Sequence, residues 1–180
     1  MTRVALGLLL SALWAAPSAA QAPPPASTPA WRPFSEFGAL LGSWSGTASS
    51  GGRIGGRIDR FTMELSGSCL VHRGSTLYPA EEGKPEETFE EVTYITYDRE
   101  KRKYVAAGFF STGVWGTFDV EFLADGGFRM TSAALVNYEA GARSRLSFSR
   151  RADGGLDAAM ELAPAGKDFA LFLRGSVKKK

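Results

Sequence analysis

The sequence has little of what metal enzymes and disulfide-stabilised domains rely on. Its 180 residues include one cysteine and one histidine, so neither residue type can pair with itself in a disulfide or a metal site. It contains no Gly-x-Ser-x-Gly, Walker or Cys-x-x-Cys motif. Neither sign of charge dominates, with 21 basic and 19 acidic residues, so we expect no nucleic-acid partner. The lone thiol, Cys69, lies among apolar residues and is expected to be buried.

The first 20 residues have the layout of a secretory signal peptide. Arg3 precedes an apolar run of 13 residues, Val4 to Ala16, and small residues follow up to Ala20. The run is shorter than the roughly 20 residues that a transmembrane helix needs. We therefore expect cleavage after Ala20, no transmembrane segment after signal removal, and a periplasmic or secreted protein.

A proline-rich stretch separates this signal from the rest of the chain. Residues 21–33 hold five prolines among alanine and serine, a composition typical of an extended linker. Residues 34–180 are enough for one domain with its own core. Removing Arg3 lowers the formal net charge from +2 to +1, and we expect a monomer or weak dimer.

From Gly42 onward, strand-like runs alternate with turns rich in aspartate and glycine, and no amphipathic helix interrupts them. Short connections of this kind join antiparallel neighbours. The pattern predicts an all-β fold, a ten-stranded antiparallel up-and-down β-barrel, because closure leaves no strand edge exposed. The expected strands are residues 42–49, 57–65, 68–78, 89–97, 104–111, 114–122, 128–137, 143–150, 156–162 and 169–177.

The segment before the first strand is expected to close one end of the barrel. Residues 34–41 form a short apolar turn that Gly42 ends, and Trp44 then enters the first strand beneath it. Gly42 and Gly46 allow the strand to bend and a neighbouring backbone to approach closely. We expect Arg174, in the last strand, to stack on the indole of Trp44.

Alternation along the strands predicts which side chains face inward. Phe118, Val120 and Phe122 fall on one face, and Trp115 stands on the opposite, polar face. The expected interior also contains residues that are small, and these leave room for a pocket: Ala106, Ser132, Ala134 and Ala158.

Several motifs resemble a known group of barrels. Gly42-Ser43-Trp44 after a helical turn resembles the Gly-x-Trp start of calycin barrels, which include lipocalins and fatty-acid-binding proteins. The lipocalin-like domains related to nitrobindin, the haem-binding barrel family, are more similar still. The motifs that carry this likeness are LLGSWSG (40–46), LSGSCLVHRGS (65–75) and YITYDREKRKYVAAGFFSTG (94–113). The resemblance implies a ten-stranded barrel with an internal cavity and no assigned substrate.

The sequence identifies no cofactor. Nitrobindin-like barrels bind iron through a histidine near the C-terminus, and no histidine follows His72, so haem held in that manner is not expected. The acids around the longest expected loop, residues 79–88, are interpreted as a solvated rim, and these include Glu90 and Glu91.

These observations leave three functions open. The favoured one is a carrier or sensor of a small apolar molecule, with no metal and no catalytic residues. Its candidate ligand-binding residues are Trp44, His72, Tyr94, Phe109, Trp115 and Phe118. The second is a cavity enzyme, an isomerase, cyclase or hydrolase of a hydrophobic metabolite, with His72 as base and Tyr94 as acid. The third is a structural barrel filled by its own side chains.

Export gives the first testable prediction. Because residues 4–16 have the length and polarity of a signal-peptide core, the mature protein should begin at or near Gln21. Intact-mass analysis of protein from the periplasm or medium of an exporting host should show the first 20 or so residues missing. Recovery of the unprocessed chain in the cytoplasm would contradict export.

Overall fold

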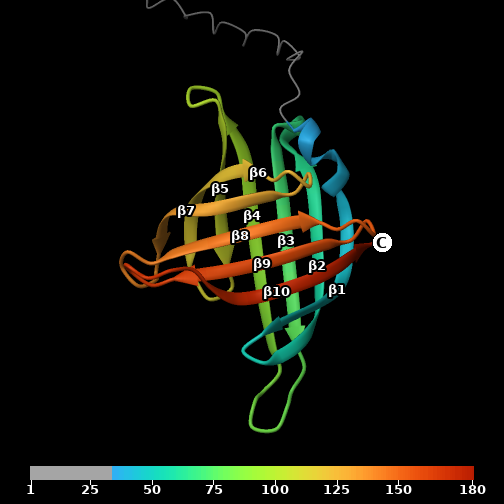
Figure 1. Ribbon diagram of the computed structural model, residues 1–180, viewed down its shortest axis with the longest axis vertical. Helices are drawn as coiled ribbons and strands as arrows, with labels where there is room; N and C mark the ends of the chain where they lie inside the picture. The colour runs from blue at the N-terminus through green and yellow to red at the C-terminus, as the bar shows by residue number, and fades with distance from the viewer. Residues whose placement is uncertain (1–33) are drawn as a thin grey trace, which may run out of the picture. The chain divides into compact units, whose positions relative to one another are not determined.

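The computed structural model describes residues 34–180, and these form ten strands (Figure 1). The strands are β1 (Gly42–Ser50), β2 (Arg53–Glu64), β3 (Cys69–Tyr78), β4 (Glu87–Asp98), β5 (Lys103–Phe110), β6 (Trp115–Phe122), β7 (Phe128–Val136), β8 (Arg143–Arg150), β9 (Leu156–Ala163) and β10 (Ala170–Lys179). Two 3₁₀ turns accompany them, η1 (Ser35–Leu40) before β1 and η2 (Leu65–Gly67) between β2 and β3. The predicted signal peptide and linker lie outside the described residues.

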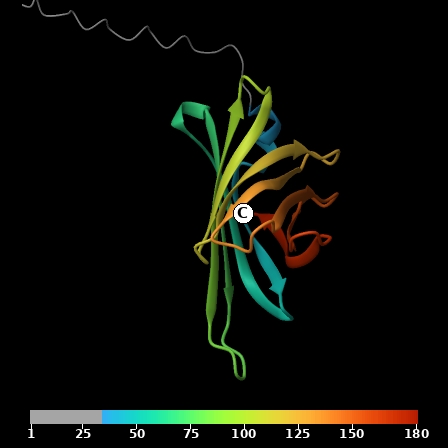
Figure 2. The ribbon, with the colours of Figure 1, turned by 90° about the vertical axis from the view of Figure 1, so that its left-hand side faces the viewer.

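The ten strands close into one antiparallel barrel. Each strand pairs with its neighbours in sequence, and β1 pairs with both β2 and β10. In Figure 1 the long strands β2 to β4 stand behind β8 to β10, which cross them, and the turned view in Figure 2 separates these two walls. The predicted all-β, up-and-down barrel is confirmed.

The η1 turn closes one end of the barrel, as the sequence predicts. Phe37 and Leu40 are fully buried. The ring of Phe37 lies 4.8 Å from that of Phe122 and 5.4 Å from those of Tyr104 and Phe128. This aromatic cluster joins η1, which we call the plug, to strands β5, β6 and β7. The plug is therefore part of the core.

Trp44 fixes the plug to the first strand. Its indole Nε1 donates a hydrogen bond of 2.8 Å to the carbonyl oxygen of Leu40, and the side chain is 2% exposed. The expectation that Arg174 stacks on this indole is wrong. The β1–β10 register places Lys179 opposite Trp44, with its Nζ 5.6 Å from the ring centroid, and Arg174 opposite Ser49.

Inward and outward faces follow the predicted alternation in most strands. Phe118 is buried and Trp115, on the other face of β6, is 38% exposed, as expected. Cys69 is buried, also as expected. Among residues 34–180, no helix combines the length and the apolar character that crossing a bilayer requires.

Two register shifts at the end opposite the plug reverse the alternation. One lies in β7 between Ser132 and Ala134, and the other lies in β10 between Leu171 and Leu173. A bulge adds one residue to a strand, so every side chain beyond it changes face. Ala134 is therefore exposed, and the prediction that it faces the interior is wrong.

The plug gives a stability prediction. Trp44→Ala removes a buried indole and its hydrogen bond to Leu40, so the free energy of unfolding should fall by about 3–5 kcal/mol. Trp115→Ala, on the half-exposed outer face, is the control and should cost about 1 kcal/mol or less. Urea unfolding measures both. Equal losses in the two variants would remove the special role assigned to Trp44.

Candidate functional site

The structure divides the six predicted ligand-binding residues between two faces. Trp44, His72 and Phe118 are 2% exposed or less and lie inside the barrel. The other three lie on the outer face at about 40% exposure, because each alternates with an inward residue: Tyr94, Phe109 and Trp115. These three cannot line an interior cavity, which corrects that part of the hypothesis. Ligand binding by any of the six stays a prediction.

A cluster of charged side chains is buried in the barrel next to His72. The guanidinium of Arg57 forms two hydrogen bonds to Asp59, Nε to Oδ2 at 2.8 Å and Nη2 to Oδ1 at 2.6 Å. Nη2 also lies 2.6 Å from Oε1 of Glu91, and Nη1 donates to the hydroxyl of Thr76. Asp59 Oδ1 in turn lies 2.8 Å from Nε2 of His72. We call Arg57, Asp59, His72 and Glu91 the ion cluster.

The ion cluster arises from strand alternation on one wall of the barrel. In β2, Arg57 and Asp59 share their face with buried Phe61, while Ile58 points outward. Register then places His72 of β3 opposite Phe61. Glu91 enters from β4 with the inward parity of that strand. Three adjacent strands thus bring the four charged or titratable groups together.

Glycines on two strands provide the space for the Arg57 side chain. A Cβ on Gly74 would lie 2.5 Å from Oε1 of Glu91, and one on Gly175 would lie 2.8 Å from Cδ of Arg57. Since real Cβ atoms do not approach other atoms this closely, any side chain at either position would displace the ion pairs. Gly175 is in β10, so the Arg57 side chain extends from β2 past β1 on the inner face of the barrel.

Electrostatics keep Arg57 and Asp59 ionised despite their burial. Burial by itself lowers the pKa of Arg57, but the charges of Glu91 and Asp59 outweigh it and raise that pKa above its ordinary value. Burial raises the pKa of Asp59, yet the hydrogen bond from His72 and the charge of Arg57 bring it below its ordinary value. The carboxylate of Asp59 and the guanidinium therefore hold their charges together.

His72 is enclosed by aromatic rings. Its imidazole stacks on Phe61 with ring centroids 4.6 Å apart and meets the edge of Phe148 at 4.8 Å. Nδ1 has no hydrogen-bond partner among the described residues, and His72 does not line the cavities described below. The proposed acid partner, Tyr94, points out of the barrel. The structure therefore does not bring the pair of the enzyme hypothesis together.

The ion cluster also has the donor types of a metal site. One ligand atom from each of Asp59, His72 and Glu91 lies within 4.8 Å of the others. Two carboxylates and an imidazole suit a divalent transition metal. However, Arg57 Nη2 already lies 2.6 Å from an oxygen of each carboxylate, so the guanidinium occupies the cation's place. A metal ion would fit only if Arg57 left the interior.

A cavity of about 140 Å³ lies at the end of the barrel opposite the plug. We call it the mouth cavity. Its lining is mainly apolar and comes from both walls: Phe89, Phe110, Thr112, Val114, Leu135, Tyr138, Ser144, Met160, Leu162 and Phe172. Leu135 and Phe172 lie at or just beyond the two register shifts, so the bulges help to form this cavity.

Ser144 is the one buried polar group of the mouth cavity without a partner among residues 34–180. Its side-chain oxygen accepts no hydrogen bond and donates none, although the residue is 1% exposed. The pairing of β7 with β8 ends at Thr131 and Arg145. Beyond that point the backbone N–H of Ser144 donates to the hydroxyl of Ser132 instead. An unpaired buried hydroxyl costs free energy that a ligand could recover.

Two side chains separate the mouth cavity from the ion cluster. Phe89 and Met160 line both the mouth cavity and a deeper void of about 10 Å³ beside Arg57 and Glu91. A void of this size holds one water molecule at most. The void beside the ion cluster is therefore too small for an organic ligand, whereas the mouth cavity has room for one.

Comparison with known proteins identifies the fold and no more. No protein-family model matches the sequence, and a search of curated proteins finds no significant match. Among solved structures, the barrel is similar to the crystal structure of Rv2717c from M. tuberculosis, with a TM-score of 0.59. The two share 15% identity over 82% of this chain and 96% of that one. Residues 34–180 thus form a ten-stranded barrel whose fold is similar to that of this solved structure.

Most of the ion cluster is not predicted from the sequence. The expectation that Glu91 belongs to a solvated rim is wrong, because Glu91 is 7% exposed and paired with Arg57. The predicted site residues do not include Arg57 or Asp59. A signal for them does exist, since they alternate with Ile54 and Ile58 and share a face with Phe61.

The ion cluster gives the third prediction. Arg57→Met leaves Asp59 and Glu91 buried without a cation, so the free energy of unfolding should fall by about 3–5 kcal/mol. Arg145→Met is the control, because Arg145 pairs with Glu161 in similar two-bond geometry but with both side chains partly exposed. It should cost about 1 kcal/mol or less. Chemical denaturation of both variants checks this, and a smaller loss for Arg57→Met than for Arg145→Met would contradict it.

Proposed function

We propose that the protein binds a small, mainly apolar molecule with one hydrogen-bonding group in the mouth cavity. The single observation that carries this proposal is an apolar cavity of about 140 Å³ that contains one buried, unpartnered hydroxyl, that of Ser144. A site of this composition is the usual form of a small-molecule pocket, with apolar walls and few polar groups that set orientation.

The size of the cavity limits the ligand to about one ring. An engineered apolar cavity of about 150 Å³ in another protein binds benzene. A long acyl chain exceeds this volume, and the void of about 10 Å³ that Phe89 and Met160 also line gives it no room to extend. A monocyclic aromatic molecule such as a phenol matches both the volume and the hydroxyl of Ser144.

The exported carrier or sensor is part of the same proposal. The signal-like residues 1–20 support export, and a shallow cavity that opens at the barrel mouth supports reversible binding over catalysis. A closer relationship to nitrobindin or to fatty-acid-binding proteins within the calycin-like barrels is likewise proposed, on the motifs around Trp44 and His72.

Two probes of equal size test the site. Isothermal titration with phenol and with toluene should show one saturable site for each, with a negative heat-capacity change. Ser144→Ala should weaken phenol binding between about two- and tenfold, the value of one hydrogen bond, and leave toluene binding unchanged. Ser147→Ala, on the outward face of β8, is the matched control and should change neither.

The outcomes separate the parts of the proposal. Absence of saturable binding by either probe contradicts a ligand-binding mouth cavity and favours a filled, structural barrel. Binding of both probes with no effect of Ser144→Ala on phenol contradicts only the polar part of the ligand class.

A further inference from the structure

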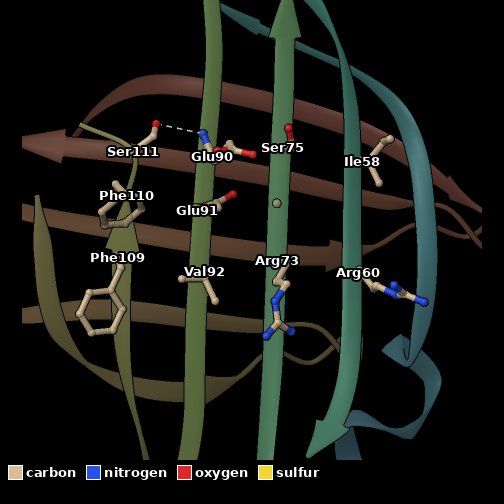
Figure 3. Close-up of a pocket in the computed structure, with 11 residues that line it drawn as sticks. Ile58, Arg60, Arg73, Ser75, Glu90, Glu91, Val92, Phe109, Phe110 and Ser111 are labelled. Carbon is tan, nitrogen blue, oxygen red and sulfur yellow. Dashed lines mark hydrogen bonds between the residues drawn. The ribbon is translucent and has the colours of Figure 1, made fainter. Parts of the chain in front are cut away.

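A second hollow lies on the outside of the barrel, independent of the proposed function. This outer groove has a volume of about 500 Å³ and runs over β2, β3, β4 and β5 (Figure 3). In Figure 3 the side chains of Ile58, Arg60, Arg73, Val92 and Phe109 come from these strands on the face turned away from the barrel interior. The mouth cavity shares only Phe110 with it.

The outer groove exposes apolar surface. Ile58 is 51% exposed and Phe109 is 42% exposed. Phe109 also stacks on Trp115 with centroids 6.0 Å apart and meets the edge of Tyr94 at 6.4 Å. Exposed apolar side chains that adjoin one another and have a polar rim typically mark an interaction surface.

Charges of both signs border this apolar surface. The side chains of Arg60 and Glu90 form no ion pair within residues 34–180. Arg73 has one partner, Glu64, at 2.9 Å, and both are well exposed. Such a surface ion pair contributes little to the free energy of folding. Arg73 can therefore exchange the carboxylate of Glu64 for another carboxylate. The groove thus offers two cations and one anion to a partner.

Strand register fixes where these groups lie. Arg60, Arg73, Val92 and Phe109 form one row across the four strands. Two residues along, Ile58, Ser75 and Glu90 form a parallel row. Ile58 and Phe109 therefore lie at opposite corners of the groove, and Arg73 and Glu90 lie on opposite sides of the diagonal that joins those corners.

We propose that the outer groove binds a second copy of this chain across a two-fold axis. The axis would lie in the plane of the interface along the Ile58–Phe109 diagonal. A two-fold interface sets each residue on the axis against its own copy and exchanges residues on either side of the axis. Ile58 and Phe109 then meet themselves, and Arg73 meets Glu90 of the second copy.

Charge complementarity favours a second copy over other occupants. The exchange brings Arg73, with Arg60 beside it, onto the unpaired Glu90 of the opposite copy, twice in each dimer. Ile58 and Phe109 lie at the two ends of the axis, where contact with their own copies removes them from water, and the charged pairs lie between these ends on either side of the axis. The surface is thus complementary to itself in both polarity and charge.

Sedimentation velocity of the full chain over a range of concentrations tests this pairing. The wild type should show a concentration-dependent monomer–dimer equilibrium. Phe109→Glu places two carboxylates at the axis and should weaken the dimer at least about tenfold. Leu171→Glu is the control, because Leu171 is 53% exposed on β10, outside the groove, and should leave the equilibrium unchanged.

A charge exchange tests the contact itself. Arg73→Glu and Glu90→Arg each create like charges across the axis, so each should weaken the dimer about tenfold. The double variant restores opposite charges and should regain wild-type association. A wild type that stays monomeric at the highest soluble concentration overturns the proposal and leaves the groove to a different partner. A double variant that is weaker than both single variants overturns the assigned axis.

Discussion

The interior of this barrel depends on the burial of one guanidinium between two carboxylates. Arg57 lies within 2.6 Å of an oxygen of both Asp59 and Glu91, and all three side chains are nearly removed from water. Buried charges persist only when they are paired and hydrogen-bonded. The absence of side chains at Gly74 and Gly175 follows from this requirement, because a methyl group at either position would occupy the space of the ion pairs. The backbone of β3 and of β10 next to Arg57 is therefore shaped to its side chain.

The same alternation links the inside of the barrel to its outside. Because Arg57 and Asp59 take inward positions of β2, the apolar residues at its outward positions, Ile54 and Ile58, are turned to solvent. In most strands with one solvated face, apolar side chains point to the core and polar ones to solvent, and this part of β2 has the reverse arrangement. The polar interior and the apolar outer groove are thus two consequences of one register, since a shift of β2 by one residue would exchange both sets.

Local signals in the sequence predict most of the fold, and long-range contacts account for what they miss. Aspartate and glycine turns delimit the ten strands, and the apolar turn before Trp44 predicts the plug. The alternation of side chains along a strand predicts the wrong face beyond a bulge, as between Ser132 and Ala134. A bulge leaves no mark in the polarity pattern of the sequence. The ion cluster is missed for another reason. Arg57 and Glu91 are 34 residues apart, and only the registers of β2 with β3 and of β3 with β4 bring them together.

The ion cluster also limits how deep a ligand can enter. A molecule that passed Phe89 and Met160 would come to lie against Arg57 and Glu91, whose hydrogen bonds already satisfy one another. An apolar ligand there would gain no polar contact, and a charged one would have to replace a paired group at a net cost. The favourable position is therefore the mouth cavity, where the walls are apolar and Ser144 has an unused hydroxyl. The bulges that widen the mouth and the ion cluster that fills the interior together favour a small ligand held near the surface over a long one held along the barrel axis.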